Sequence, residues 1–160
     1  MLCSARIHDT IASGSGFFQH GHTYIGHPMA MAAAGAVLGR LTDGATLPAV
    51  VATGNALKAR LADAFAQHPN VGDIRGRGLF LGLELVRDRE TKAPFDPAHK
   101  LHKRVKAAAM EAGLMCYPMG GTIDGRQGDH VLLAPPFILS ENQIDEVVSK
   151  LSTALQVALP

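Results

Sequence analysis

Residues 71–86 have the sequence VGDIRGRGLFLGLELV, which is the most informative part of the chain for its fold. β-Branched and other apolar residues are interrupted there by glycines, which predicts two short strands with a tight bend near Gly76–Gly78. The glycine spacing also loosely resembles a dinucleotide-binding loop, but that motif needs a preceding strand and a helix that begins within it. Residues 79–81 instead continue as a strand pattern, so we interpret the glycines as structural.

Helical patterns flank these strands on both sides. Apolar residues at helical spacing predict one helix over about 46–67. A second is predicted to begin at Asp96-Pro97, an N-cap followed by proline at the first helical position, and to end at Gly113. Ser140 and Gln143 form a capping box that predicts the start of the last helix.

Two further strands are predicted either side of a glycine-rich segment, over 114–119 and 130–138. The order from about residue 44 is then helix, two strands, helix, two strands, helix. A small sheet with helices on one face is the natural packing of such a chain, so we expect residues 43–160 to form an α+β domain.

Residues 1–42 do not fit that plan. We expect a short helix over 5–12, then a loop rich in glycine and histidine, although its adjacent Phe17 and Phe18 favour burial. An alanine-rich helix follows from Pro28 to about residue 41 and is apolar on nearly every face, which predicts burial all round. This segment resembles the end of another domain.

Composition excludes several classes of protein and partner. A net charge of +1 gives no strong field for nucleic acid or an anionic membrane. The longest apolar run, 29–38, is too short to cross a bilayer. Two cysteines make no disulfide framework, and free thiols suit a reducing compartment, so we expect a cytoplasmic protein.

Candidate chemistry from single residues is sparse. His20, His22 and His27 are the densest group of potential metal ligands, but sequence supplies no fourth ligand, and we interpret them as ordinary loop histidines rather than a zinc site. Arg126, alone in the glycine-rich segment, could bind a carboxylate bidentately or could be a solvated hairpin residue.

One segment carries more information than these. The run FQHGHTYIGHP at 18–28, followed by the alanine-rich helix, closely resembles the class III aminotransferases, which are pyridoxal-phosphate enzymes of fold type I. The resemblance continues through GDIRGRGLF at 72–80 and Leu-Glu-Leu at 83–85. It ends with Gly-Asp-His at 128–130 and Ala-Pro-Pro at 134–136, in the order and spacing of the family. Many members that use α-amino acids have an arginine just before Ala-Pro-Pro. Residues 131–133 are Val-Leu-Leu, a pattern closer to the ω-amino acid and amine transaminases.

The resemblance implies a partial α/β chain of fold type I. Residues 1–42 would be the tail of the large pyridoxal-phosphate domain, and 43–160 the small C-terminal α+β domain. Thr23, helped by the backbone at His22, would bind the phosphate of the pyridoxal 5'-phosphate held by the neighbouring subunit of a homodimer. Arg126 is the nearest candidate for binding the substrate carboxylate. The substrates would be an amino acid or amine donor and a 2-oxo acid acceptor.

No catalytic residue is expected within this chain. The family's Schiff-base lysine lies roughly thirty residues before the His-Thr-Tyr segment, which places it upstream of Met1, so we expect these 160 residues alone to be inactive. The alternative is a non-catalytic, truncated remnant that binds a phosphate ligand or a protein partner.

Overall fold

The hairpin expected at residues 71–86 forms the edge of a four-stranded antiparallel sheet in the computed structural model, which describes residues 3–159. The strands are β1 (Val71–Arg77), β2 (Phe80–Leu85), β3 (Tyr117–Gly120) and β4 (Asp129–Leu133), in the spatial order β1-β2-β4-β3.

Arg77 pairs with Phe80, so only two residues connect β1 to β2. Gly78, in this connection, has a left-handed φ of +56°. Gly76, at the end of β1, has a φ of +143°, and a Cβ there would lie 2.1 Å from the Phe80 carbonyl oxygen. The predicted hairpin and its glycine bend are confirmed.

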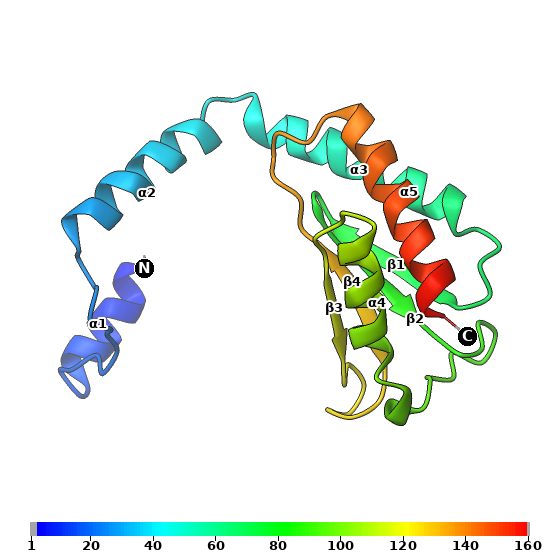
Figure 1. Ribbon diagram of the computed structural model, residues 1–160. Coiled ribbons are helices and arrows are strands. Elements are labelled where there is room, and N and C mark those ends of the chain that lie inside the picture. Colours follow the sequence, from blue (N-terminus) through cyan, green and yellow to red (C-terminus); the bar gives the residue numbers. More distant parts are fainter. Residues whose placement is uncertain (1–2, 160) are drawn as a thin grey trace. The chain divides into compact units, whose positions relative to one another are not determined.

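Three helices cover one face of this sheet, as Figure 1 shows: α3 (Thr46–Ala64), α4 (Leu101–Glu111) and α5 (Glu141–Ala158). Alternate residues of β2 and β4 are buried beneath them. The largest fully buried side chains come from all three helices, from this face and from Val86 just after β2: Leu57, Leu61, Leu81, Leu83, Leu85, Val86, Leu101, Val105, Val131, Leu151 and Leu155. The predicted α+β arrangement is confirmed.

The caps expected at two helices are present. Gln143 Oε1 accepts the Ser140 N–H at 2.9 Å, so the capping box opens α5. Gly113 follows the end of α4 with a φ of +75°, the left-handed conformation expected of a residue just beyond a helix.

The helix predicted from Asp96-Pro97 is interrupted. Asp96 does accept the Ala98 N–H at 2.9 Å, but only a 3₁₀ turn follows, η1 (Pro97–His99). Lys100 then adopts a left-handed conformation, and α4 begins at Leu101. Two other predicted elements are shorter than expected: α3 ends at Ala64, and β4 ends at Leu133 because two prolines follow closely.

The chain divides into two compact units, Met1–Arg40 and Leu41–Pro160. The first contains α1 (Ala5–Ser13) and nearly all of α2 (Pro28–Leu41). The prediction that α2 is buried all round is wrong for this chain, since α2 has no buried residue and Met29 is 77% exposed. Phe17 and Phe18 are exposed as well. Within its own unit α2 has too few neighbouring residues to cover an apolar surface on every side.

No helix within residues 3–159 combines the length and apolarity needed to cross a bilayer.

Candidate functional site

Thr23 lies in the turn that leads into α2. The Ile25 N–H donates to the His22 carbonyl oxygen at 3.0 Å, and the His27 N–H donates to that of Tyr24 at 3.1 Å. Thr23 is exposed, and its hydroxyl has no hydrogen-bond partner among the described residues. No acidic side chain occurs between residues 18 and 28. A hydroxyl and backbone N–H groups without a nearby carboxylate suit a phosphate, so the donors present fit the phosphate of pyridoxal phosphate.

The histidines of this loop contact aromatic rings. The His20 ring lies 5.6 Å from that of Phe18, and the His27 ring lies 6.1 Å from that of Tyr24. In the described part of the chain, residues 3–159, no three His, Cys, Asp or Glu side chains come together in a way that could hold a metal ion.

Arg126 lies in the loop that joins β3 to β4. Asp124 Oδ1 accepts the backbone N–H groups of Gln127 at 2.6 Å and Arg126 at 2.9 Å. These two hydrogen bonds, of which the one from Gln127 has the larger effect, hold the pKa of the Asp124 carboxyl below its usual range. Asp124 is therefore ionised at neutral pH. The Arg126 side chain is exposed and forms no ion pair with any described residue. The loop therefore fixes the Arg126 backbone while its guanidinium is available to an anion.

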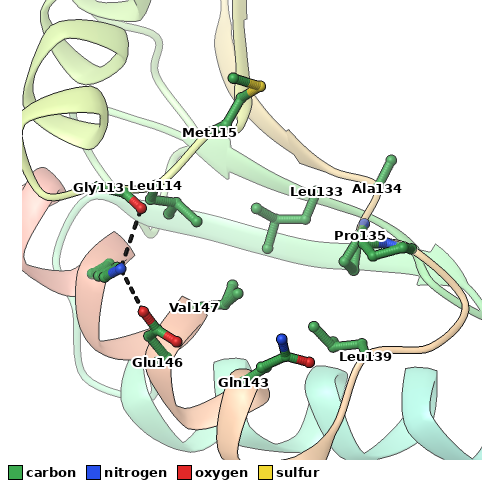
Figure 2. Close-up of a pocket in the computed structure, with 12 residues that line it drawn as sticks. Gly113, Leu114, Met115, Leu133, Ala134, Pro135, Leu139, Gln143, Glu146 and Val147 are labelled. Carbon is green, nitrogen blue, oxygen red and sulfur yellow. Dashed lines mark hydrogen bonds and ion pairs between the residues drawn. The ribbon is translucent and has the colours of Figure 1, made fainter.

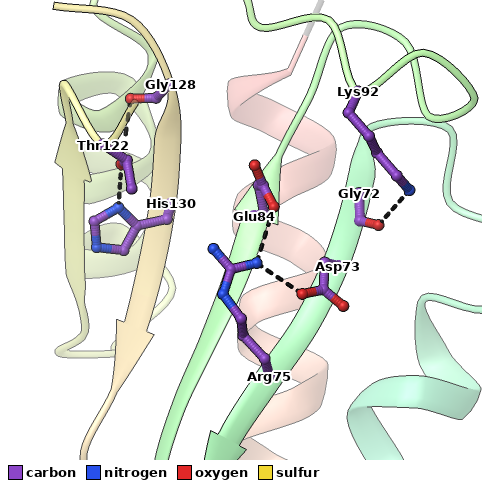
Figure 3. A network of polar contacts seen from close by, with 8 residues as sticks. All are labelled: Gly72, Asp73, Arg75, Glu84, Lys92, Thr122, Gly128 and His130. Carbon is purple, nitrogen blue, oxygen red and sulfur yellow. Dashed lines mark hydrogen bonds and ion pairs between the residues drawn. The ribbon is translucent and has the colours of Figure 1, made fainter. Parts of the chain in front are cut away.

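Arg75 has the opposite surroundings, on the sheet face that the helices leave uncovered (Figure 3). Its Nη1 donates to Asp73 Oδ2 at 2.7 Å and to Glu84 Oε2 at 2.9 Å. The hydrogen bond from Arg75 is the main reason that the pKa of Asp73 is lowered, and both carboxylates raise the pKa of Arg75. Because two carboxylates already occupy this guanidinium, Arg75 is a poorer candidate than Arg126 for binding a substrate carboxylate.

A groove of about 340 Å³ lies between the end of β4 and helix α5. Figure 2 shows Leu114, Leu133, Leu139 and Val147 around it. Its only cation, Lys150, donates from Nζ to the Gly113 carbonyl oxygen at 3.2 Å and to Glu146 at 2.5 Å. The groove is thus mainly apolar, and its charged groups bind each other.

The six lysines are either exposed or paired. Five of them are exposed, namely Lys58, Lys92, Lys100, Lys103 and Lys106. The ammonium of Lys92 also donates to the Gly72 carbonyl oxygen at 2.7 Å (Figure 3), and Lys150 is half-buried but paired.

The family model described as aminotransferase class III matches residues 1–155. The chain belongs to the class III aminotransferases. Among curated relatives of this chain, an aminotransferase of Gibberella zeae is 42% identical over 160 residues, which cover 99% of this chain and 31% of that protein.

Solved structures agree. An (S)-enantioselective ω-transaminase from Thermomicrobium roseum has a TM-score of 0.83 and 32% identity, covering 98% of this chain and 33% of that one. A pyridoxal-phosphate-bound aminotransferase mutant from Vibrio fluvialis has a TM-score of 0.77 and 33% identity, covering 92% of this chain and 31% of that one. The resemblance to class III and ω-type transaminases, and the partial α/β fold, are therefore confirmed. The chain spans about a third of the length of the relatives it matches.

The predicted site residues Thr23 and Arg126 lie in different units, and their roles stay predictions. The sequence shows Asp129 close to Arg126, but sequence reasoning missed that Asp129 is only 5% exposed and contacts His102 at the start of α4. The clustering of Gly120, Gly121 and Gly128 around this loop was the available signal, since close approach of neighbouring groups is one reason to place glycine.

Proposed function

We propose that residues 1–160 are the C-terminal part of a pyridoxal-phosphate-dependent aminotransferase that transfers an amino group between an amino acid or amine and a 2-oxo acid. The observation that carries this proposal is the match to the class III family over residues 1–155, together with an unpartnered Thr23 hydroxyl in the His-Thr-Tyr turn. Free cysteines support a cytoplasmic location.

Thr23 and the backbone at His22 would hold the cofactor phosphate. The cofactor, when bound, supplies a sink for electrons released at the substrate carbon. The contribution of this chain would be positional: a hydroxyl and N–H groups in the turn before α2 would orient the phosphate. By resemblance to the family, this phosphate would belong to the cofactor of the partner subunit in a homodimer.

Arg126 would bind the substrate carboxylate. Arg126 forms no ion pair with any described residue, whereas Arg75 pairs with both Asp73 and Glu84, and this difference supports the choice of Arg126. A planar guanidinium can hold both carboxylate oxygens and thereby orient an amino acid without contributing to the transfer of protons.

Chemistry at the amino group would require a reactive lysine, and the six lysines of this chain are exposed or paired. We therefore expect the chain alone to show no amino transfer when it is supplied with pyridoxal phosphate, an amino donor and a 2-oxo acid.

The test uses the full-length protein that contains these residues. With pyridoxal phosphate it should transfer amino groups, and Arg126→Ala should raise the KM for amino acids by roughly tenfold or more while leaving uncharged amines nearly unchanged. Arg75→Ala, which removes an already paired arginine, is the matched control and should show no such selectivity. Absence of amino transfer in the full-length protein would refute the proposed activity, and an equal effect of Arg126→Ala on both substrate classes would refute the role of Arg126.

A further inference from the structure

Asp129 is the one buried charged side chain in the described part of the chain. It begins β4, immediately after the loop that carries Arg126. Burying a carboxylate is costly unless hydrogen bonds replace the lost water, so the contacts of Asp129 indicate what the burial achieves.

Asp129 contacts the start of α4. Its Oδ1 lies 3.1 Å from the backbone nitrogen of His102, which donates to it, and 3.0 Å from His102 Nδ1. Lys100, the residue before α4, forms no side-chain cap. Asp129 therefore replaces the missing cap from a distant strand, and its negative charge is favourable at the positive end of the helix.

Gly120 completes this contact. It pairs with Asp129 across the β3–β4 ladder, and a Cβ on Gly120 would lie 2.5 Å from Nδ1 of the His102 ring. The ring thus packs against Gly120, beside the Asp129 carboxylate, at the base of the loop. On the other sheet face the Thr122 hydroxyl lies 2.7 Å from His130 Nδ1 (Figure 3), so the base of the loop is held on both sides.

Above this base the loop is internally bonded. The Gly121 N–H donates to the Gly128 carbonyl oxygen at 2.7 Å, and that of Ile123 donates to Gln127 at 3.0 Å. The N–H groups of Arg126 and Gln127 also donate to Asp124. Through these hydrogen bonds the position of the Arg126 backbone depends on the position of the base of the loop.

We propose that Asp129, through His102 and the start of α4, is a positioning residue that fixes where the Arg126 guanidinium meets the substrate carboxylate. This inference rests on the proposed role of Arg126. Asp129 touches no substrate; it sets the geometry of the loop, and a displacement of the order of 1 Å is enough to impair binding of an oriented substrate.

The test is a double-mutant cycle in the full-length enzyme, with Asp129→Asn, Arg126→Ala and the combination. Asp129→Asn keeps the size of the side chain but removes its charge. It should raise the KM for amino acids roughly tenfold, with little change for uncharged amines, and should add nothing in the Arg126→Ala background. Asp145→Asn, which removes an exposed carboxylate that pairs with Arg60 on another part of the domain, is the matched control and should change neither KM.

Two further measurements keep the inference testable if Asp129→Asn does not fold. His102→Ala retains the backbone bond to Asp129 and should give a smaller shift in the same direction. In the 160-residue chain, His102→Ala should also speed hydrogen exchange at the amides of Arg126 and Gln127, relative to the Asp145→Asn control.

The outcomes separate the two proposals. A selective Arg126→Ala effect combined with an unselective Asp129→Asn effect, or an Asp129→Asn effect that persists without Arg126, would overturn this inference alone. An unselective Arg126→Ala effect would overturn the role of Arg126 and this inference with it.

Discussion

Arg126 and Arg75 carry the same group in opposite surroundings, and the difference comes from single neighbouring residues. Asp73 and Glu84 bind the Arg75 guanidinium, whereas Asp124 uses its carboxylate on backbone N–H groups and leaves the Arg126 side chain unpaired. Both arginines are visible in the sequence, but which one is available to a ligand depends on pairing across the sheet, which residue spacing does not determine.

The two cysteines should differ in reactivity. Cys116 is half-buried against the core, and burial raises the pKa of its thiol, so the thiolate that reacts is scarcer at neutral pH. Cys3 is exposed. We expect iodoacetamide to label Cys3 well before Cys116, measured by peptide mapping over time. A Cys3→Ser variant serves as the control, and rapid labelling of that variant would contradict the burial of Cys116.

At the scale of the helices and strands, local signals predicted most of the architecture. The capping box at Ser140, the glycine after α4 and the glycine bend at Gly76 each depend on residues close in sequence, and each is present. The break at Lys100 was missed because its cause is distant: Asp129, on β4, accepts the His102 N–H and fixes where α4 begins.

Helix α3 approaches the β1–β2 bend closely enough to require glycine. A Cβ on Gly54 would lie 2.3 Å from the Gly78 carbonyl oxygen, and this neighbour is backbone that cannot rotate away. We expect Gly54→Ala to lower the free energy of unfolding by about 1–3 kcal/mol, despite the better helix propensity of alanine. Denaturant unfolding measures this change. Asn55→Ala, at the next and exposed position, is the control; equal or greater stability of Gly54→Ala would show that the helix and the bend are not in close contact.

At the scale of the molecule, the unit Met1–Arg40 exposes much apolar surface. Phe17 is 64% exposed and Met29 is 77% exposed. The sequence indicated correctly that α2 is apolar on nearly every side. Whether such a helix is buried depends on which other residues pack against it, and the composition of the helix does not determine that. In the family to which the chain belongs, the matched proteins are about three times as long.

This surface should drive association of the 160-residue chain. We expect its apparent mass in sedimentation to increase with concentration. Met29→Lys combined with Val37→Lys places charge on two exposed positions of α2 and should reduce the association. The matched control, Lys58→Ala combined with Lys106→Ala, alters exposed positions of the other unit and should leave it unchanged. A monomer at every concentration would contradict this expectation.

The affinity of the full-length enzyme for pyridoxal phosphate, with and without Thr23→Ala, tests the central claim most directly. If the Thr23 hydroxyl binds the cofactor phosphate, its loss removes one charge-assisted hydrogen bond, worth about 1–3 kcal/mol, and absorbance titration should show a dissociation constant raised by roughly 5- to 150-fold. Ser15→Ala, which removes an exposed hydroxyl from the same unit, should leave that constant unchanged. An unaltered dissociation constant in Thr23→Ala would contradict the account.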